Sequence, residues 1–226
     1  MDNGSVKAGG AGAKGRVFEL SGGHPALDLV NTLDWRFRES GPEELLNDYG
    51  DVLGFAEQSG LLTTADARQL LRGVPESKDE EVVEAVRKLR ESTAEVLYAA
   101  VDGTRPSASA LRRLEACFAE AKEHQELKWD GEKLNWTLPQ STSLPTLPLW
   151  LLSLSTAEFM TSEQMHHLRE CGNAECRWLF VDTSKNHTRR WCNMKICGNR
   201  MKARRFKAQL RAEAAQLRAE GAQHRS

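Results

Sequence analysis

Apolar residues recur three and four positions apart along much of this 226-residue chain, which is typical of α-helices that bury one face. The clearest stripe predicts a helix from about Lys78 to Val101, and a second predicts one from about Ser107 to Glu123. A more uniformly apolar run predicts a third long helix from Leu149 to Arg169. The first stripe consists of Val82, Val83, Val86, Leu89, Thr93, Val96 and Leu97. The pattern therefore predicts a mainly helical fold.

Two shorter helices are expected earlier in the chain, at Asp48–Ser59 and Thr63–Arg72. Gly60 and Gly73 follow their expected ends, where glycine commonly adopts the left-handed conformation that closes a helix. Each helix is short enough to need packing against its neighbours, so we expect both to join the same helical domain.

Strand signals occur in two places. The segment that starts at Arg16 begins strand-like, turns at Gly22-Gly23 and continues into a helix with Pro25 in its first turn. Residues Leu127–Leu138 alternate apolar and polar positions around Asp130-Gly131, which favours a tight β-hairpin. The chain thus adds little β-structure to its helices.

These patterns divide the chain into three expected parts. Residues 1–15 are rich in glycine and alanine without periodicity, so they are predicted to be a disordered tail. Residues 16–170 are predicted to form a mainly helical domain with a small β-hairpin. Residues 171–226 are predicted to form a separate small module with a C-terminal helix. No uninterrupted apolar run approaches the roughly 20 residues that span a bilayer, so we expect a cytoplasmic protein without membrane contact.

The formal net charge of −1 hides a strong asymmetry. Residues 171–226 hold 13 lysines and arginines against 4 acidic residues, a net +9. The remaining 18 and 28 leave −10 for residues 1–170. A compact basic segment attracts phosphates, so any nucleic-acid contact is expected in the C-terminal quarter. The alternative is that the two oppositely charged parts attract each other.

Four of the five cysteines form two equally spaced pairs near the C-terminus, Cys171-x4-Cys176 and Cys192-x4-Cys197. Four thiolates brought to one point suit tetrahedral Zn²⁺, and a shell filled by sulfur leaves no open position for catalysis, so we predict one structural zinc ion. The alternative is four buried or disulfide-bonded cysteines. The fifth, Cys117, lies on an apolar helix stripe and is expected to be a packing residue.

Two stretches of the chain resemble known families. The first stretch contains Cys171-Gly-Asn-x-x-Cys176, Trp178-Leu-Phe-x-Asp-x-Ser-Lys-Asn186, Arg189-Arg-Trp-Cys-x-Met194 and Cys197-Gly-Asn-Arg200. Together these segments resemble the CGNR zinc finger. The segment Gly22-Gly-His-Pro-Ala-Leu-Asp-Leu-Val-Asn-Thr32 is similar to the opening of the ABATE domain that accompanies this finger. The resemblance implies a bacterial, stress-induced transcription regulator with Cys171, Cys176, Cys192 and Cys197 as zinc ligands. His166, His167 and His187 are nearby alternatives to a thiolate.

The module is expected to be a zinc-ribbon or treble-clef-like finger. Residues Arg177–Asp182 are predicted to form a strand, Thr183–Asn186 a turn, and His187–Trp191 a return to the second cysteine pair, which opens a helix. So small a segment lacks a hydrophobic core of its own, so bound metal would supply much of its folding free energy, roughly 10 kcal/mol or more.

A basic helix is expected after Cys197. Arg200, Arg204, Lys207, Arg211 and Arg218 recur at helical spacing, with an apolar stripe roughly opposite, which suits a helix that lies along DNA or RNA. The residues expected to contact nucleic acid are Lys185, Asn186, Arg189, Arg190, Asn199, Arg200, Lys202, Arg204, Arg205, Lys207 and Arg211. The apolar stripe consists of Ala203, Phe206, Leu210, Ala214 and Leu217. The alternatives are solvated charges beside a packing stripe, and side chains that hold the finger together.

Polar and aromatic residues crowd the start of the helical domain. His24, Asp28, Asn31 and Trp35 are candidates to line a small-molecule effector pocket, since the last three fall at helical spacing on one face. The alternative is a structural polar network that satisfies backbone groups and caps a helix.

Three functions remain open from the sequence. The first is a zinc-dependent DNA-binding transcription regulator whose N-terminal domain senses a ligand or partner, and the second is an RNA-binding protein that uses the same surface. The third, an enzyme with His24 and Asp28 as acid and base, ranks last because no nucleophile–base arrangement or phosphate-binding loop is visible, so we expect no enzyme. A homodimer is compatible with all of them.

Overall fold

The structure, a computed structural model, describes residues 15–73, 76–139 and 144–223. The expected tail therefore lies outside the described residues, apart from Gly15. The helices are α1 (Pro25–Asn31), α2 (Tyr49–Gln58), α3 (Thr64–Gly73), α4 (Glu76–Val101), α5 (Ala108–Glu123), α6 (Leu147–Met160) and α7 (Asn199–Gln223), with a 3₁₀ turn at Glu163–His167 and a π turn at Met194–Gly198. The strands are β1 (Leu33–Asp34), β2 (Glu43–Glu44), β3 (Glu126–Trp129), β4 (Leu134–Thr137), β5 (Leu168–Glu170) and β6 (Leu179–Val181).

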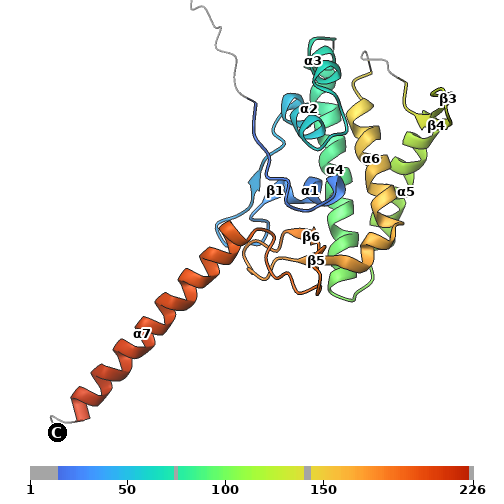
Figure 1. The fold of residues 1–226 in the computed structure, drawn as a ribbon. Coiled ribbons are helices and arrows are strands. Elements are labelled where there is room, and N and C mark those ends of the chain that lie inside the picture. Colours follow the sequence, from blue (N-terminus) through green and yellow to red (C-terminus); the bar gives the residue numbers. More distant parts are fainter. Residues whose placement is uncertain (1–14, 74–75, 140–143, 224–226) are drawn as a thin grey trace, which may run out of the picture.

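Helices α1 to α6 form the body, with α4, α5 and α6 side by side and α4 at its centre (Figure 1). Helix α6 is apolar around its whole circumference, which is typical of a helix that is buried on more than one side. Its Leu152 is 1% exposed and its Phe159 is fully buried. The apolar stripe of α4 faces the same core, where Val86 and Leu97 are fully buried. The prediction of a mainly α fold is confirmed.

Local capping explains where the helices begin. The side chain of Asp48 accepts a hydrogen bond from the N–H of Asp51 at the start of α2, and Ser107 does the same for Ala110 at the start of α5. Pro25 occupies the first turn of α1, as expected. The predicted bounds of α2, α3, α4 and α5 hold to within two residues.

The predicted β-hairpin is confirmed as β3 and β4, which pair antiparallel with Trp129 opposite Leu134 and Leu127 opposite Trp136. These four apolar side chains share one face, and each is at least half exposed. Asp130 closes the turn by accepting hydrogen bonds from the N–H groups of Glu132 and Lys133. The hairpin projects at the edge of the body (Figure 1).

Two sequence predictions for the body are wrong in detail. The helix expected to run to Arg169 ends at Met160, because the hydroxyls of Thr161 and Ser162 donate to carbonyls of its last turn and Ser162 then caps the 3₁₀ turn. The segment after Arg16 pairs with no strand among the described residues. Instead, the Gln58 amide accepts from the N–H of Phe18 and donates to the carbonyl of Arg16, so a side chain takes the place of a neighbouring strand.

Candidate metal centre and nucleic-acid interface

The first cysteine pair lies in the connection between β5 and β6, and the second lies in the segment that leads into α7. Strands β5 and β6 pair antiparallel, with Arg169 opposite Phe180. The strand predicted within residues 177–182 is confirmed as β6. The prediction that residues 187–191 pair with it is wrong, because β6 pairs with β5 instead. Cys197 lies in the π turn that leads directly into α7. The finger thus joins the metal centre rigidly to the basic helix.

The four sulfurs converge on one point. Their Sγ atoms all lie within 4.8 Å of one another, and the Cys176–Cys192 and Cys192–Cys197 pairs are 3.7 Å apart. A tetrahedral ion with Zn–S bonds of about 2.3 Å places its sulfurs about 3.8 Å apart, whereas a disulfide needs about 2.05 Å. The geometry therefore fits one zinc ion and excludes disulfides. His167 and His187, offered as alternative ligands, stack on each other with ring centroids 4.4 Å apart and lie outside this group.

The ionisation of the four thiols also requires a cation. The pKa of Cys171 is lowered because the other three thiols donate hydrogen bonds to its thiolate. The pKa of Cys176 and that of Cys192 are raised, because their protons are held in those hydrogen bonds. Four thiolates at this spacing repel one another unless a divalent metal binds all of them.

Polar groups around the sulfurs fix the shape of the site. The Asn173 side chain, 1% exposed, donates from Nδ2 to Cys197 Sγ at 3.8 Å. The N–H of Cys171 bonds to the carbonyl of Trp178 at 2.9 Å. A Cβ at Gly172 would lie only 3.2 Å from the Trp191 ring, so this position has little room for a side chain. A hydrogen bond to a ligand atom fixes the orientation of that ligand, so Asn173 helps to hold Cys197 in place. In the sequence, Asn173 is recognisable only as part of the cysteine motif.

Arg189 holds the finger together. Its guanidinium donates to the carbonyls of Trp191 and Cys192 and, at 3.1 Å, to that of Ser21 in the body. It also lies 4.3 Å from the centroid of the Phe180 ring. Because these contacts use the hydrogen-bond donors of its guanidinium, Arg189 has a structural role and is not a candidate for binding phosphate.

The finger is docked on the body through α1. The Asn31 side chain donates to the carbonyl of Leu179 and accepts from its N–H, both at 3.0 Å, so it pairs with β6 as a neighbouring strand would. The N–H of Val181 bonds to the carbonyl of Gly22 at 2.8 Å, and the Tyr98 hydroxyl donates to the carbonyl of Arg177. Asn31, a candidate ligand residue, thus has a structural task that links the two parts.

The other ligand candidates are engaged in different ways. His24 caps α1 by accepting from the N–H of Ala26 at 3.2 Å, and burial lowers its pKa. Asp28, 6% exposed, accepts from the N–H of Gly22 at 2.7 Å, and burial raises its pKa to about 7. Trp35 adopts a positive φ of 50° and packs against the cysteine cluster. Among the four, Trp35 lines a cavity, which is described further below.

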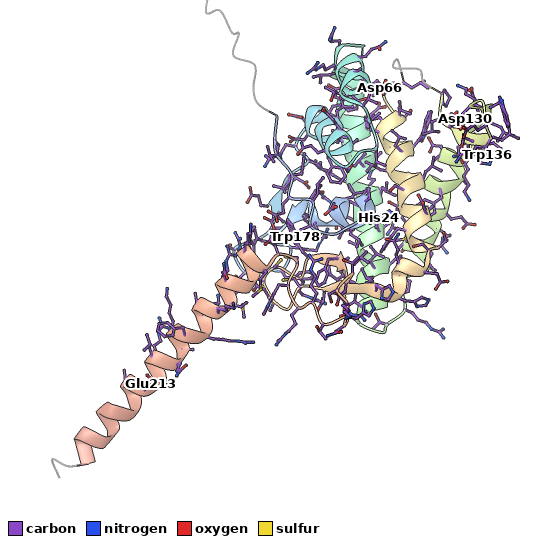
Figure 2. The ribbon with its side chains drawn as sticks, viewed as in Figure 1. His24, Asp66, Asp130, Trp136, Trp178 and Glu213 are labelled. Atoms are coloured by element: carbon purple, nitrogen blue, oxygen red, sulfur yellow. The ribbon has the colours of Figure 1, made fainter. Side chains whose placement is uncertain are left out.

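The basic residues of α7 fall into two groups. Arg200 lies 4.2 Å from the centroid of the Trp35 ring, and Arg204 forms a bidentate pair with Glu175 at 2.8 and 2.9 Å, so both tie the helix to the protein. Among the other basic side chains that the structure describes in α7, four are exposed and form no ion pair with any described residue: Lys202, Arg205, Lys207 and Arg211. The side chain of Arg218, also expected on the basic face, lies outside the described ones. Figure 2 shows α7 standing clear of the body around Glu213. Phe206 and Leu210, on the apolar stripe, are 62% and 48% exposed.

The remaining candidates lie on the finger surface. Lys185 and Asn186 are exposed in the loop after β6. Arg190 is exposed with its guanidinium 5.4 Å from the centroid of the Trp191 ring. Asn199 donates to the carbonyl of Lys195 at the start of α7. All four side chains are exposed to solvent.

A helical body joined to a four-thiolate finger that opens a basic helix defines a zinc-finger protein. The chain matches the ABATE family, described as "putative stress-induced transcription regulator", over residues 23–163, and the CGNR zinc finger over residues 167–209. The chain therefore belongs to the ABATE family and carries a CGNR zinc finger, which confirms both resemblances. No curated protein matches it in sequence. Within the described ranges, no helix combines the length and the apolarity that a bilayer crossing requires.

Replacing a ligand should abolish metal binding. We expect about one zinc ion per chain in the purified protein and almost none in Cys197→Ser, because three sulfurs leave the shell incomplete. Cys117→Ser is the matched control, since Cys117 packs against the core of the body and lies outside the metal group. Elemental analysis after gel filtration measures the ratio. Equal zinc in both variants would contradict the assignment.

Asn31→Ala should destabilise the contact between α1 and β6. We expect its free energy of unfolding to fall by about 2–3 kcal/mol, because the N–H and carbonyl of Leu179 lose their partners in a buried place. The control is Asn135→Ala, which removes a hydrogen bond to Asp130 on the exposed hairpin. Urea unfolding of both variants gives the comparison, and an equal loss in both would rule out a special role for Asn31.

Asp28 should make stability depend on pH. The folded carboxyl keeps its proton to about pH 7, whereas the unfolded one has an ordinary pKa of 3.8 and loses its proton there. The unfolded state therefore releases the proton first, and stability falls as pH rises from about 4 to about 7, by at most about 4 kcal/mol. Asp28→Asn, which retains an acceptor for Gly22, should lose less stability than the parent between pH 5 and pH 8. Parallel urea titrations at the two pH values test this, and identical pH dependence would refute it.

Proposed function

We propose that this protein is a zinc-dependent DNA-binding transcription regulator that uses α7 and the adjoining finger surface as its DNA contact. The observation that carries the proposal is the set of four exposed cations on α7 without acidic partners among the described residues, Lys202, Arg205, Lys207 and Arg211. Lysine and arginine side chains that are already paired gain less from a phosphate, so unpaired ones are better suited to bind it.

The dimensions of α7 support the same proposal. Its 25 residues span about 37 Å, close to one turn of duplex DNA, and the major groove admits an α-helix. Residues 199–214 hold six lysines and arginines against one glutamate, which gives the exposed part of the helix a strong positive field. The zinc centre fixes its first turn, so less order has to be acquired on binding.

The acidic body supplies the remaining functions of a regulator. The descriptions of the two matched families name a transcription regulator and a zinc finger, and neither names an enzyme. We propose that the body senses an effector and transmits its state through the joint of α1 with β6. A homodimer stays a prediction, with the exposed stripe of Phe206 and Leu210 as its expected contact.

The DNA contact is tested by the salt dependence of binding. The double variant Lys207→Gln/Arg211→Gln should bind a duplex of about 30 base pairs more weakly and should lower the slope of log K against log salt by about 1.8, since each lost phosphate contact removes about 0.9. Fluorescence anisotropy at several salt concentrations measures the slope.

The matched control is Arg112→Gln/Lys122→Gln, which removes two exposed charges from α5 and should leave the slope unchanged. Equal slopes for parent and α7 variant would contradict the proposal. Tighter binding of a structured RNA, with the same loss of slope in the α7 variant, would replace DNA by RNA as the partner.

A further inference from the structure

A cavity of about 220 Å³ lies where the body meets the finger. Trp35 and Leu45 contribute its wall from the body, and Trp178 and Ile196 contribute from the finger. Trp178 marks this junction in Figure 2. Since a cavity of about 150 Å³ holds benzene, this one accommodates a molecule of roughly eight to ten non-hydrogen atoms. The place suits a small ligand that touches both parts of the protein.

The charged residues that line the cavity favour a positively charged ligand. Glu19 and Asp34 line the cavity, and no lysine or arginine is found among the described residues that line it. Neither carboxylate forms an ion pair with a described residue. Asp34 accepts from the N–H of Trp35 at 2.7 Å, and burial raises its pKa despite the attraction of Arg38. A cation in the cavity would offset this cost.

The aromatic residues favour the same charge. The guanidinium carbons of Arg38 and Arg200 lie 4.1 and 4.2 Å from the centroid of the Trp35 ring, so this indole binds two cations of the protein itself, and Trp178 is the indole of the wall that remains for a ligand. The Nε1–H of Trp178 lies beside Asp34 and lowers the pKa of that carboxyl. Sulfur atoms of Cys176, Cys192 and Cys197 belong to residues of the same wall. The Trp178 ring, the two carboxylates and the zinc-binding sulfurs together favour an organic cation over an anion.

We propose that this cavity binds a small organic monocation, an ammonium group carried by an aromatic ring or a short apolar chain. The cation lies against Asp34 and Glu19, and the apolar part packs against Trp178 and Leu45. Because Ile196 precedes α7 by three residues, an occupied cavity also fixes the start of that helix relative to the body. This role as an effector site rests on the proposed function, whereas the binding itself does not.

The probe is benzylammonium, with benzyl alcohol as a neutral molecule of the same size. Calorimetry with the zinc-loaded full chain should show benzylammonium binding at least about tenfold more tightly, in line with a cation–π and carboxylate contribution. Asp34→Asn, which keeps the acceptor for the N–H of Trp35, should remove the preference, and Glu19→Gln should reduce it. The matched control is Glu39→Gln, because Glu39 is exposed in the connection between β1 and β2 and does not line the cavity.

The place of binding is read from the indole N–H signals in an NMR titration. Those of Trp35 and Trp178 should shift, while those of Trp129 and Trp136 on the distant hairpin should not. The proposal is overturned by equal affinity for the two probes, by a preference that survives Asp34→Asn, by shifts confined to the hairpin, or by the absence of binding. None of these outcomes involves DNA, so a failure here is distinguishable from a failure of the proposed DNA contact.

Discussion

The convergence of four sulfurs on one metal ion is the constraint on which the rest of the structure depends. The finger buries few apolar side chains beside its cysteines, with Phe180 fully buried and three tryptophans partly buried around it. Such a core is too small to offset the ordering of its loops, and zinc binding contributes on the order of 10 kcal/mol in comparable modules. Metal therefore determines whether Cys197 is held, and Cys197 determines where α7 starts.

The contacts of each cationic side chain distinguish those with a structural role from those that are available to bind a phosphate. Arg189 donates hydrogen bonds to backbone carbonyls, and Arg177 donates to carboxylates. Arg204 donates to the carboxylate of Glu175. In contrast, four cations of α7 face solvent: Lys202, Arg205, Lys207 and Arg211. The acidic body thus does not cover the basic helix in this structure. The cavity lies at another part of the boundary between body and finger, where the body, the metal ligands and the π turn before α7 share one wall.

Much of the body follows from periodicity, because long amphipathic helices such as α4 repeat their signal over many turns. The cysteine spacing likewise predicted the metal centre. A short element was missed: β5 has three residues, too few for alternation to show, and they followed an apolar run that was read as helix. The end of α6 was missed because the apolar run was extended past the hydroxyls that cap it. The pairing of Asn31 with Leu179 joins residues 148 positions apart, and no local pattern encodes it.

The central claim is that these four cysteines bind zinc and thereby fix α7. X-ray absorption at the zinc edge of the purified full chain tests it most directly. The account predicts a single shell of four sulfurs at about 2.3 Å. A shell containing nitrogen or oxygen ligands, or a chain that folds with α7 in place and holds no zinc, would contradict it.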